Sequence, residues 1–215
     1  MKRYLPFAII AAVLVIAILA GALMYRTKQP PISTTPVPTP SLDPNQARTN
    51  NRTAVTLEEF GDYQCPPCGT LHPVLKTIKD EFGDRVQFSF RHFPLVQIHQ
   101  HAVAASQAAV AAGLQGRFWE MHDLLYKNQS VWSSATDARP IFLSYARQLG
   151  LNVDLFVNDM GGNRANTIVA SDLRRGQALG VNSTPTVFIN GREIPFEELK
   201  IDNLRKEIRS LLNGG

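Results

Sequence analysis

Cysteine is almost absent from this chain, with only two among 215 residues. A scaffold held by several disulfides and a four-cysteine zinc module are therefore both excluded. The body of the chain also lacks a charge excess. Lys and Arg number 22 against 18 Asp and Glu, but four of the basic residues lie in residues 1–28, which contain no acidic residue. The remaining 18 basic and 18 acidic residues balance, so we expect no nucleic-acid binding, which needs a clustered positive face.

The sequence also lacks an internal repeat and any strong compositional bias. Hydrophobic residues make up 44% and charged residues 19% of the chain, which excludes collagen-like and wholly disordered proteins. We predict one folded domain over residues 54–215, which is long enough to bury a sizeable core.

The N-terminus holds one long apolar segment. Residues 5–25 contain no charged side chain, and this length is about what a helix needs to span a bilayer core. Lys2 and Arg3 precede the segment, which predicts a cytoplasmic N-terminus. We expect residues 1–26 to be a transmembrane anchor, with a cleaved signal peptide as the alternative because an A-x-A pattern lies near the end of the run. Either reading places the domain outside the cytoplasm, in the cell envelope or secreted.

Residues 27–53 form a segment rich in Pro, Ser and Thr. Six of the chain's 14 prolines lie here, and almost no apolar side chain is available for burial. Such a composition favours an extended, semi-rigid tether between the N-terminal segment and the domain.

The start of the domain predicts a β-α-β unit. Val55 and Leu57 alternate with polar neighbours, a strand pattern, and residues 68–82 carry apolar side chains at helical spacing up to Gly83. Residues 86–90 alternate again, so the two predicted strands are parallel, as a helical crossover between them requires.

The remaining elements predict a helical insert followed by a hairpin and a helix. Residues 100–172 show helical periodicity only. Strands return at residues 187–189 and 192–194, where Asn190–Gly191 is a strong hairpin signal. A last amphipathic helix is predicted over residues 196–212. The order is β-α-β, helical insert, β-β-α, an α/β fold.

The chemistry of the sequence centres on Cys65-Pro66-Pro67-Cys68. A disulfide across so short a ring stabilises a fold poorly, by about 1.9 kcal/mol in the loop-entropy treatment, so reversible redox chemistry explains the pair better. A helix that begins at Cys65 would favour its thiolate through free N–H groups and a partial positive charge. We therefore predict that Cys65 is the exposed nucleophile and Cys68 the buried resolving thiol.

Three other interpretations of the cysteine pair remain open. They are half of a zinc site, an inert structural disulfide and two unlinked core thiols. No second C-x-x-C and no nearby histidine pair completes a zinc site, so we expect no metal and no cofactor beyond a redox-active Cys65–Cys68 disulfide. The five histidines are scattered, and we interpret them as solvated or core residues.

At this point the chain resembles the DsbA-like thiol–disulfide oxidoreductases, in their membrane-anchored bacterial branch. The resemblance rests on EFGDYQCPPC (residues 59–68), GRFWEMHDLLY (residues 116–126) and GVNSTPTVFING (residues 180–191). It implies a thioredoxin fold with a helical domain inserted after the second strand, which agrees with the predicted order of elements.

The resemblance also implies roles for further residues. Thr184-Pro185 matches the cis-proline loop that lies beside the active disulfide and binds substrate, and we place Pro66 and Pro67 at the same substrate-binding surface. Glu59 matches a buried acid beneath the resolving cysteine, which could take a proton from it. The neighbouring Glu58 could instead be the inward-facing carboxylate.

One position departs from the family pattern. Oxidising members often carry a histidine between the two cysteines, where this chain has Pro67. The intervening dipeptide tunes reduction potential, so the direction of electron transfer stays open at this stage.

The preferred function is an extracytoplasmic disulfide oxidase that passes its disulfide to thiols of reduced or unfolded exported proteins. A membrane redox partner would reoxidise the cysteine pair, and the domain is expected to be a monomer. Two alternatives remain: a reductase or isomerase of the same fold, and a non-catalytic peptide-binding or chaperone module.

Overall fold

The structure is a computed structural model that describes residues 55–214. The predicted anchor (1–26) and tether (27–53) lie outside the described residues. Within residues 55–214, no helix combines the length and the apolar character needed to cross a membrane.

The β-α-β unit forms as the sequence predicts. Strand β1 (Val55–Gly61) leads through helix α2 (Pro66–Phe82) and a short 3₁₀ turn, η1 (Gly83–Arg85), to strand β2 (Val86–His92), which pairs with β1 in parallel. Helix α2 ends where Gly83 takes a φ of 52°, a left-handed conformation that glycine adopts without steric cost. The parallel pairing follows from the helical crossover.

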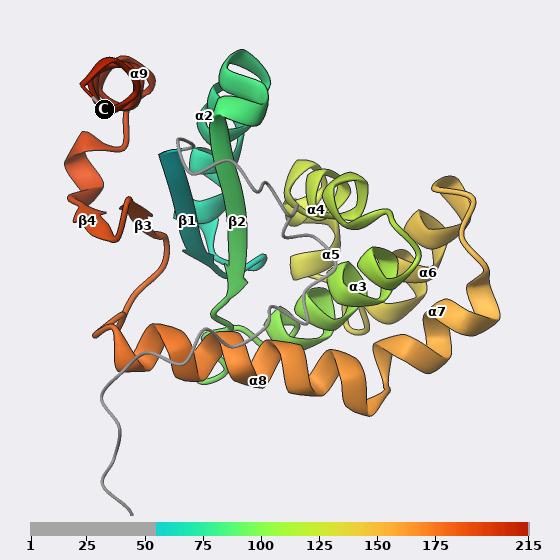
Figure 1. Cartoon of the computed structure of the whole chain (residues 1–215). Coiled ribbons are helices and arrows are strands. Elements are labelled where there is room, and N and C mark those ends of the chain that lie inside the picture. The colour runs from blue at the N-terminus through green and yellow to red at the C-terminus, as the bar shows by residue number, and fades with distance from the viewer. Residues whose placement is uncertain (1–54, 215) are drawn as a thin grey trace, which may run out of the picture. The chain divides into compact units, whose positions relative to one another are not determined.

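The second half of the sheet is a hairpin. Strand β3 (Thr186–Ile189) runs antiparallel to β1 and turns through Asn190–Gly191 into β4 (Arg192–Ile194). Both turn residues have positive φ, at 47° and 77°, as a tight hairpin turn requires. The sheet order is β2-β1-β3-β4, so β1 is central and β2 is an edge strand next to the helical insert (Figure 1).

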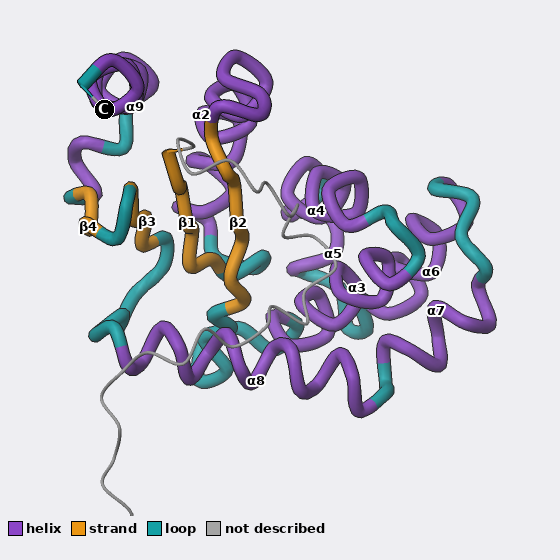
Figure 2. The backbone as a smooth tube through the Cα atoms, in the orientation of Figure 1, coloured by secondary structure: helices purple, strands orange, loops and turns teal. Residues whose placement is uncertain are grey.

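The insert is a cluster of helices between β2 and β3 (Figure 2). The short helix α5 was not predicted, because five residues carry no resolvable periodicity. The last helix of the insert ends at Ala178, close to the end near Gln177 that its helical spacing predicts, and it contacts β2 where the chain returns to the sheet. The helices are α3 (Ala102–Leu114), α4 (Phe118–Lys127), α5 (Gln129–Ser133), α6 (Arg139–Gln148), α7 (Val153–Met160) and α8 (Asn163–Ala178).

The C-terminal element differs from the prediction of one helix over residues 196–212. A 3₁₀ turn, η2 (Phe196–Glu198), comes first, and helix α9 (Ile201–Asn213) begins after it. Between them Lys200 is extended, with φ −108° and ψ 146°, and Leu199 is buried. Burying Leu199 against the core interrupts the helical path.

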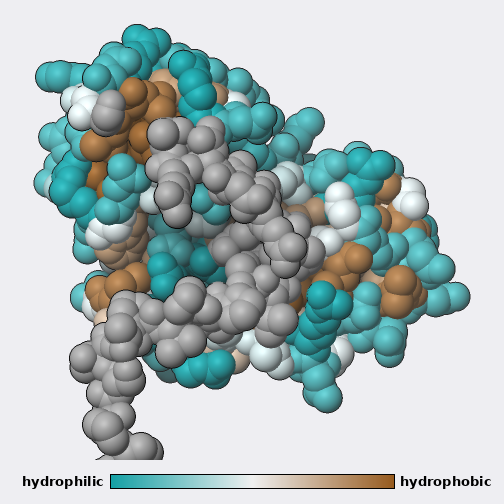
Figure 3. Space-filling model, viewed as in Figure 1, coloured by the Kyte–Doolittle hydropathy of each residue, from teal (hydrophilic) through white to brown (hydrophobic). Residues whose placement is uncertain are grey.

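Each face of the sheet has its own core. Val55 and Leu57 face α2 and α9, whose inward side chains include Leu75 and Ile208. The opposite face carries Phe60 and packs against α8. On the side viewed in Figure 3, patches of hydrophobic side chains lie among hydrophilic ones.

Candidate redox site

The position of Glu59 follows from the alternation of strand β1. Residues 55, 57 and 59 share one face, so Glu59 points with Leu57 towards α2 and is only 4% exposed. Its lateral neighbours in the sheet are Phe90 and Val187, both apolar. Glu58 faces the other way, where Arg91 and Arg175 bind its carboxylate at 2.7 and 3.0 Å. Glu59 is therefore the buried carboxylate of the two.

Cys65 lies at the N-cap of α2, and Pro66 and Pro67 occupy the first two helical positions. Neither proline has a backbone N–H, so this helix end loses two of its usual free donors. The next N–H belongs to Cys68 and acts on the Cys65 sulfur. The two prolines are exposed.

The two cysteines carry free thiols, and both are buried. Cys68 is completely covered, while Cys65 is 5% exposed. The prediction of an exposed Cys65 is therefore wrong, although Cys65 is the more exposed of the two cysteines. Its thiol is covered from the side of the β3 loop, where it donates a hydrogen bond to the carbonyl oxygen of Thr184 at 3.3 Å.

The environment separates the acidities of the two thiols. The largest influence on Cys65 is a hydrogen bond from the Cys68 thiol. Together with the Cys68 backbone N–H and the Thr184 hydroxyl, which is free to donate to the ionised sulfur, it lowers the Cys65 pKa from 9.0 to about 6 despite burial. Burial, reinforced by the hydrogen bond to Cys65, raises the pKa of Cys68. At neutral pH this arrangement favours a thiolate at Cys65 and a thiol at Cys68.

The carboxyl group of Glu59 also has a shifted pKa. Burial, and secondarily the negative charge at Cys65, raise its pKa from 4.5 to about 8. Its Oε1 atom has no hydrogen-bond partner among residues 55–214. A carboxyl group with these properties is protonated near neutrality and can exchange a proton with a neighbouring thiol.

The Thr184–Pro185 peptide bond is cis, and the loop that contains it lies against the Cys65 sulfur. Thr184 is 9% exposed, and its hydroxyl has no partner among the described residues. The structure therefore brings Cys65, Cys68 and Thr184 together, with Glu59 close enough to influence both sulfurs electrostatically.

Asp62 is a site residue that the sequence analysis did not identify. Its fully buried carboxylate accepts hydrogen bonds from the backbone of Gln64 and Leu95 and pairs with His99 at 2.7 Å. Its negative charge opposes ionisation of Cys65. The available signal was its place in the quoted EFGDYQCPPC segment, but pairing with His99 depends on the fold.

Gln129 is a second such residue. From helix α5 its side-chain N–H groups donate to the carbonyl oxygens of Tyr63 and Cys65 at 2.7 and 2.9 Å. Gln64 adds a contact in the other direction by donating to the Ser133 carbonyl at 3.2 Å. The helical insert thus holds the loop before the cysteines, a role that no sequence signal identified.

An apolar groove lies beside the cysteine motif, between the start of α2 and the turn η2. Phe196 is 61% exposed at its edge, which is unusual for a large apolar side chain. The groove is lined by Pro66, Pro67, Thr70, Leu71, Val74, Phe196 and Leu199.

Comparison with solved structures finds the same overall fold in known proteins. A thioredoxin-like oxidoreductase from Silicibacter pomeroyi superposes with a TM-score of 0.64 at 25% identity, covering 80% of this chain and 95% of that one. BdbD from Bacillus subtilis gives a TM-score of 0.66 at 22% identity, with 76% and 90% covered. The oxidoreductase DsbA from Xylella fastidiosa gives 0.59 at 20% identity, with 74% and 88% covered.

The fold and the cysteine pair together define a protein of the thioredoxin class, with the overall fold also seen in BdbD and DsbA. The family model described as thioredoxin matches residues 46–210. The chain belongs to the thioredoxin family.

Curated relatives include much longer proteins. The Na(+)/H(+) antiporter NhaA 1 of Salinispora arenicola is 37% identical over 151 residues, which cover 70% of this chain but 22% of that protein. A second such antiporter, NhaA 3 of Salinispora tropica, is 36% identical over 151 residues, with the same shares covered. The chain thus spans about a fifth of the length of these relatives.

Proposed function

We propose that this protein is an extracytoplasmic disulfide oxidase for reduced, exported proteins. The observation that carries the proposal is the difference in acidity between the two thiols. A Cys65 pKa of about 6 makes this sulfur a good leaving group and stabilises the reduced protein, which is the property of an oxidant. The location outside the cytoplasm rests on the apolar N-terminal segment of the sequence.

The proposed reaction begins from the oxidised Cys65–Cys68 pair. A substrate thiolate attacks the Cys65 sulfur, so the Cys65–Cys68 bond breaks and a mixed disulfide forms. Cys68 leaves with the electron pair and takes a proton from Glu59, which is neutral because its pKa is about 8. In the reoxidation half-reaction, Glu59 accepts the proton back from Cys68.

A second substrate thiolate then attacks the substrate sulfur of the mixed disulfide. Cys65 leaves as a stabilised thiolate, the substrate gains a disulfide, and two electrons remain on the cysteine pair. A membrane redox partner that accepts two electrons would restore the disulfide.

Substrate would bind across the cis-proline loop and the apolar groove. An extended peptide could pair with the Thr184 backbone while an apolar side chain fills the groove near Phe196. Unfolded proteins offer both features, because their strands are unpaired and their apolar side chains are exposed.

The test is the reduction potential of the full chain in glutathione buffers, with thermal melts of both redox forms. We expect a potential of about −200 to −120 mV, above that of thioredoxin, and a reduced form that melts at the higher temperature. An oxidised form that melts higher would indicate a reductase.

A Cys65→Ser variant separates catalysis from simple peptide binding. The variant should lose all oxidative refolding of a reduced test protein. If it still raised the yield of refolded protein as the wild type does, the domain would be a chaperone module instead.

A further inference from the structure

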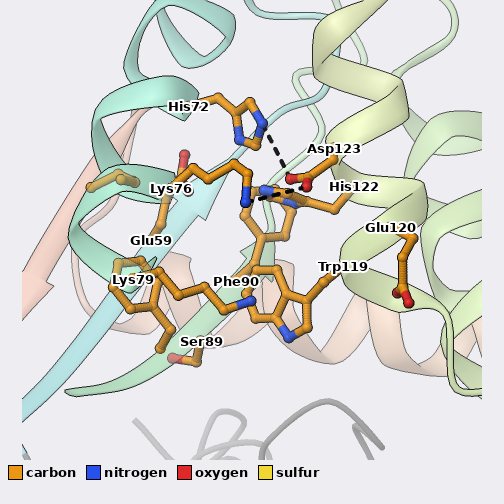
Figure 4. Close-up of a pocket in the computed structure, with 12 residues that line it drawn as sticks. Glu59, His72, Lys76, Lys79, Ser89, Phe90, Trp119, Glu120, His122 and Asp123 are labelled. Atoms are coloured by element: carbon orange, nitrogen blue, oxygen red, sulfur yellow. Dashed lines mark ion pairs between the residues drawn. The ribbon is translucent and has the colours of Figure 1, made fainter. Parts of the chain in front are cut away.

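Two histidines and an aspartate come together between the helices α2 and α4, apart from the groove that Pro66 and Pro67 line. His72 lies on α2, and His122 and Asp123 lie on α4 (Figure 4). The Nε2 atom of His72 lies 3.3 Å from Oδ1 of Asp123. One possible ligand atom from each of the three residues lies within 4.8 Å of the others. None of the three takes part in the proposed thiol exchange.

These side chains line a cavity rather than a packed contact. His72, His122 and Asp123 line a cavity whose wall also includes Phe90 and Trp119. A ligand or a water molecule can therefore reach the three side chains without rearrangement of the helices.

His122 is oriented in the way that a metal-binding histidine usually is. Its ring is 4% exposed, and its Nδ1 atom is paired with the Tyr63 hydroxyl at 3.0 Å. In the tautomer in which Nδ1–H donates to the Tyr63 oxygen, Nε2 carries no proton and its lone pair is able to bind an ion. Such a hydrogen bond on the second ring nitrogen is the common support of a metal-ligating histidine.

We propose that His72, His122 and Asp123 form a binding site for a divalent cation of the zinc class, which would join α2 to α4. Two imidazole nitrogens and one carboxylate oxygen are a donor set that Zn²⁺ accepts, with water in the fourth position. Ligand atoms around a tetrahedral Zn²⁺ lie about 3.3 Å apart at ligand distances of about 2.0 Å. The His72–Asp123 pair already has this separation, and rotation of the side chains must draw in the third ligand.

The positive charges of two nearby lysines oppose the binding of a cation at this site. The Lys76 ammonium lies 3.8 Å from Oδ2 of Asp123, and Lys79 lies over the Trp119 ring at 3.4 Å. Lys76 has a second partner in Asp80, at 3.0 Å, to which it can remain bound when an ion arrives. Glu59 and Glu120 also line the cavity and favour a cation when they are ionised. Removal of the Lys76 charge should therefore strengthen binding.

The test is isothermal titration of the untagged full chain with zinc sulfate near pH 7.5. The protein is fully oxidised, so that the two cysteine sulfurs are held in the disulfide and cannot bind zinc. We expect one Zn²⁺ per chain with micromolar affinity, no response to Mg²⁺, and a melting temperature that rises with zinc concentration.

Four variants locate the site. His72→Ala and Asp123→Asn should each weaken binding at least tenfold, whereas Lys76→Ala should strengthen it severalfold. His101→Ala removes a histidine outside the cluster and should leave the affinity unchanged. Circular dichroism checks that each variant is folded. No heat and no change in melting temperature at 1 mM zinc, or affinity unchanged in both His72→Ala and Asp123→Asn, would overturn the proposal. Neither result depends on whether the protein acts as an oxidase.

Discussion

The hydroxyl of Thr184 provides the most direct test of how the fold makes Cys65 acidic. In the thiol form Cys65 donates to the Thr184 carbonyl, and the Thr184 hydroxyl has no partner among the described residues. Once the thiol ionises, it can no longer donate, and the hydroxyl can donate to the sulfur instead. Thr184→Val removes this donor with little change of shape.

The size of the effect follows from the energy of one hydrogen bond to a charged group, about 1.5–3 kcal/mol. One pKa unit corresponds to about 1.4 kcal/mol, so the loss should raise the Cys65 pKa by about one to two units. From a starting value of about 6, the lower end of this range gives the variant a pKa of about 7, which is the value used below.

The assay is the pH dependence of iodoacetamide alkylation of the reduced protein, with modified Cys65 identified by mass spectrometry. Thiolate reactivity rises by about 0.4–0.5 log units per pKa unit. The variant should therefore react about threefold more slowly than wild type near pH 5 and about threefold faster above pH 8, with the two rate curves crossing between about pH 6 and 7.

Thr77→Val is the matched control. The Thr77 hydroxyl donates to the Pro73 carbonyl oxygen on the exposed side of α2, the helix that begins after Cys65. The rate curve of Thr77→Val should superpose on that of the wild type. A folded Thr184→Val protein with an unchanged midpoint would refute the assignment of the hydroxyl as a thiolate donor. Preferential modification of Cys68 would refute the assignment of Cys65 as the nucleophile.

Three further predictions concern the buried carboxyl group of Glu59, the contact between Gly69 and Gln129, and the apolar groove beside Phe196. Because the pKa of Glu59 is raised to about 8 in the folded state, the free energy of unfolding should fall as the pH rises from about 4.5 to 8. In chemical denaturation Glu59→Gln should therefore match wild type at pH 4.5 and be more stable at pH 9 by up to about 5 kcal/mol, and it should exchange disulfides more slowly. If variant and wild type were equally stable at both pH values, Glu59 would ionise freely. A Cβ on Gly69 would lie 2.7 Å from Oε1 of Gln129, which is too close. Gly69→Ala should therefore add about 1 kcal/mol to the free energy of unfolding only when Gln129→Ala is also present. An equal gain in the wild type and in Gln129→Ala would contradict the contact. Phe196→Ser should weaken binding of an unfolded peptide in fluorescence anisotropy while leaving the alkylation midpoint of Cys65 unchanged, and unaltered peptide affinity would exclude Phe196 from the substrate surface.

The order of the elements could be predicted from local signals in the sequence, and the thioredoxin fold followed from the family resemblance of three motifs. Gly83 ended a periodic helix, and Asn190–Gly191 supplied the two residues that a tight hairpin accepts. The last helix was predicted too long because nothing local marks the break. Leu199 leaves the helical path to reach the core, and a tertiary contact of this kind carries no sequence signal.

The site was predictable where its residues lie in the short motifs that resemble the family, which hold the cysteine pair and Thr184-Pro185. The cysteine pair was evident, and strand alternation allowed Glu58 or Glu59 to face inward until the packing of α2 and α8 on opposite faces decided the matter. The histidines were misleading, because spacing along the chain says little about contacts across it. His72 and His122 come from separate helices, and only the packing of α2 against α4 brings their rings within 5.0 Å.

The two prolines between the cysteines have a consequence for the redox chemistry. Pro67 stands where oxidising relatives were expected to carry a histidine, and a proline offers neither a side-chain donor nor a backbone N–H. The Cys65 thiolate must then be stabilised from outside the dipeptide. The Cys68 thiol and backbone N–H act from one side and Thr184 from the other. Since substrate would occupy the Thr184 loop, its binding should also change the acidity of Cys65. A peptide that occupies the loop without a thiol should therefore shift the alkylation midpoint of the wild type and leave that of Thr184→Val nearly unchanged.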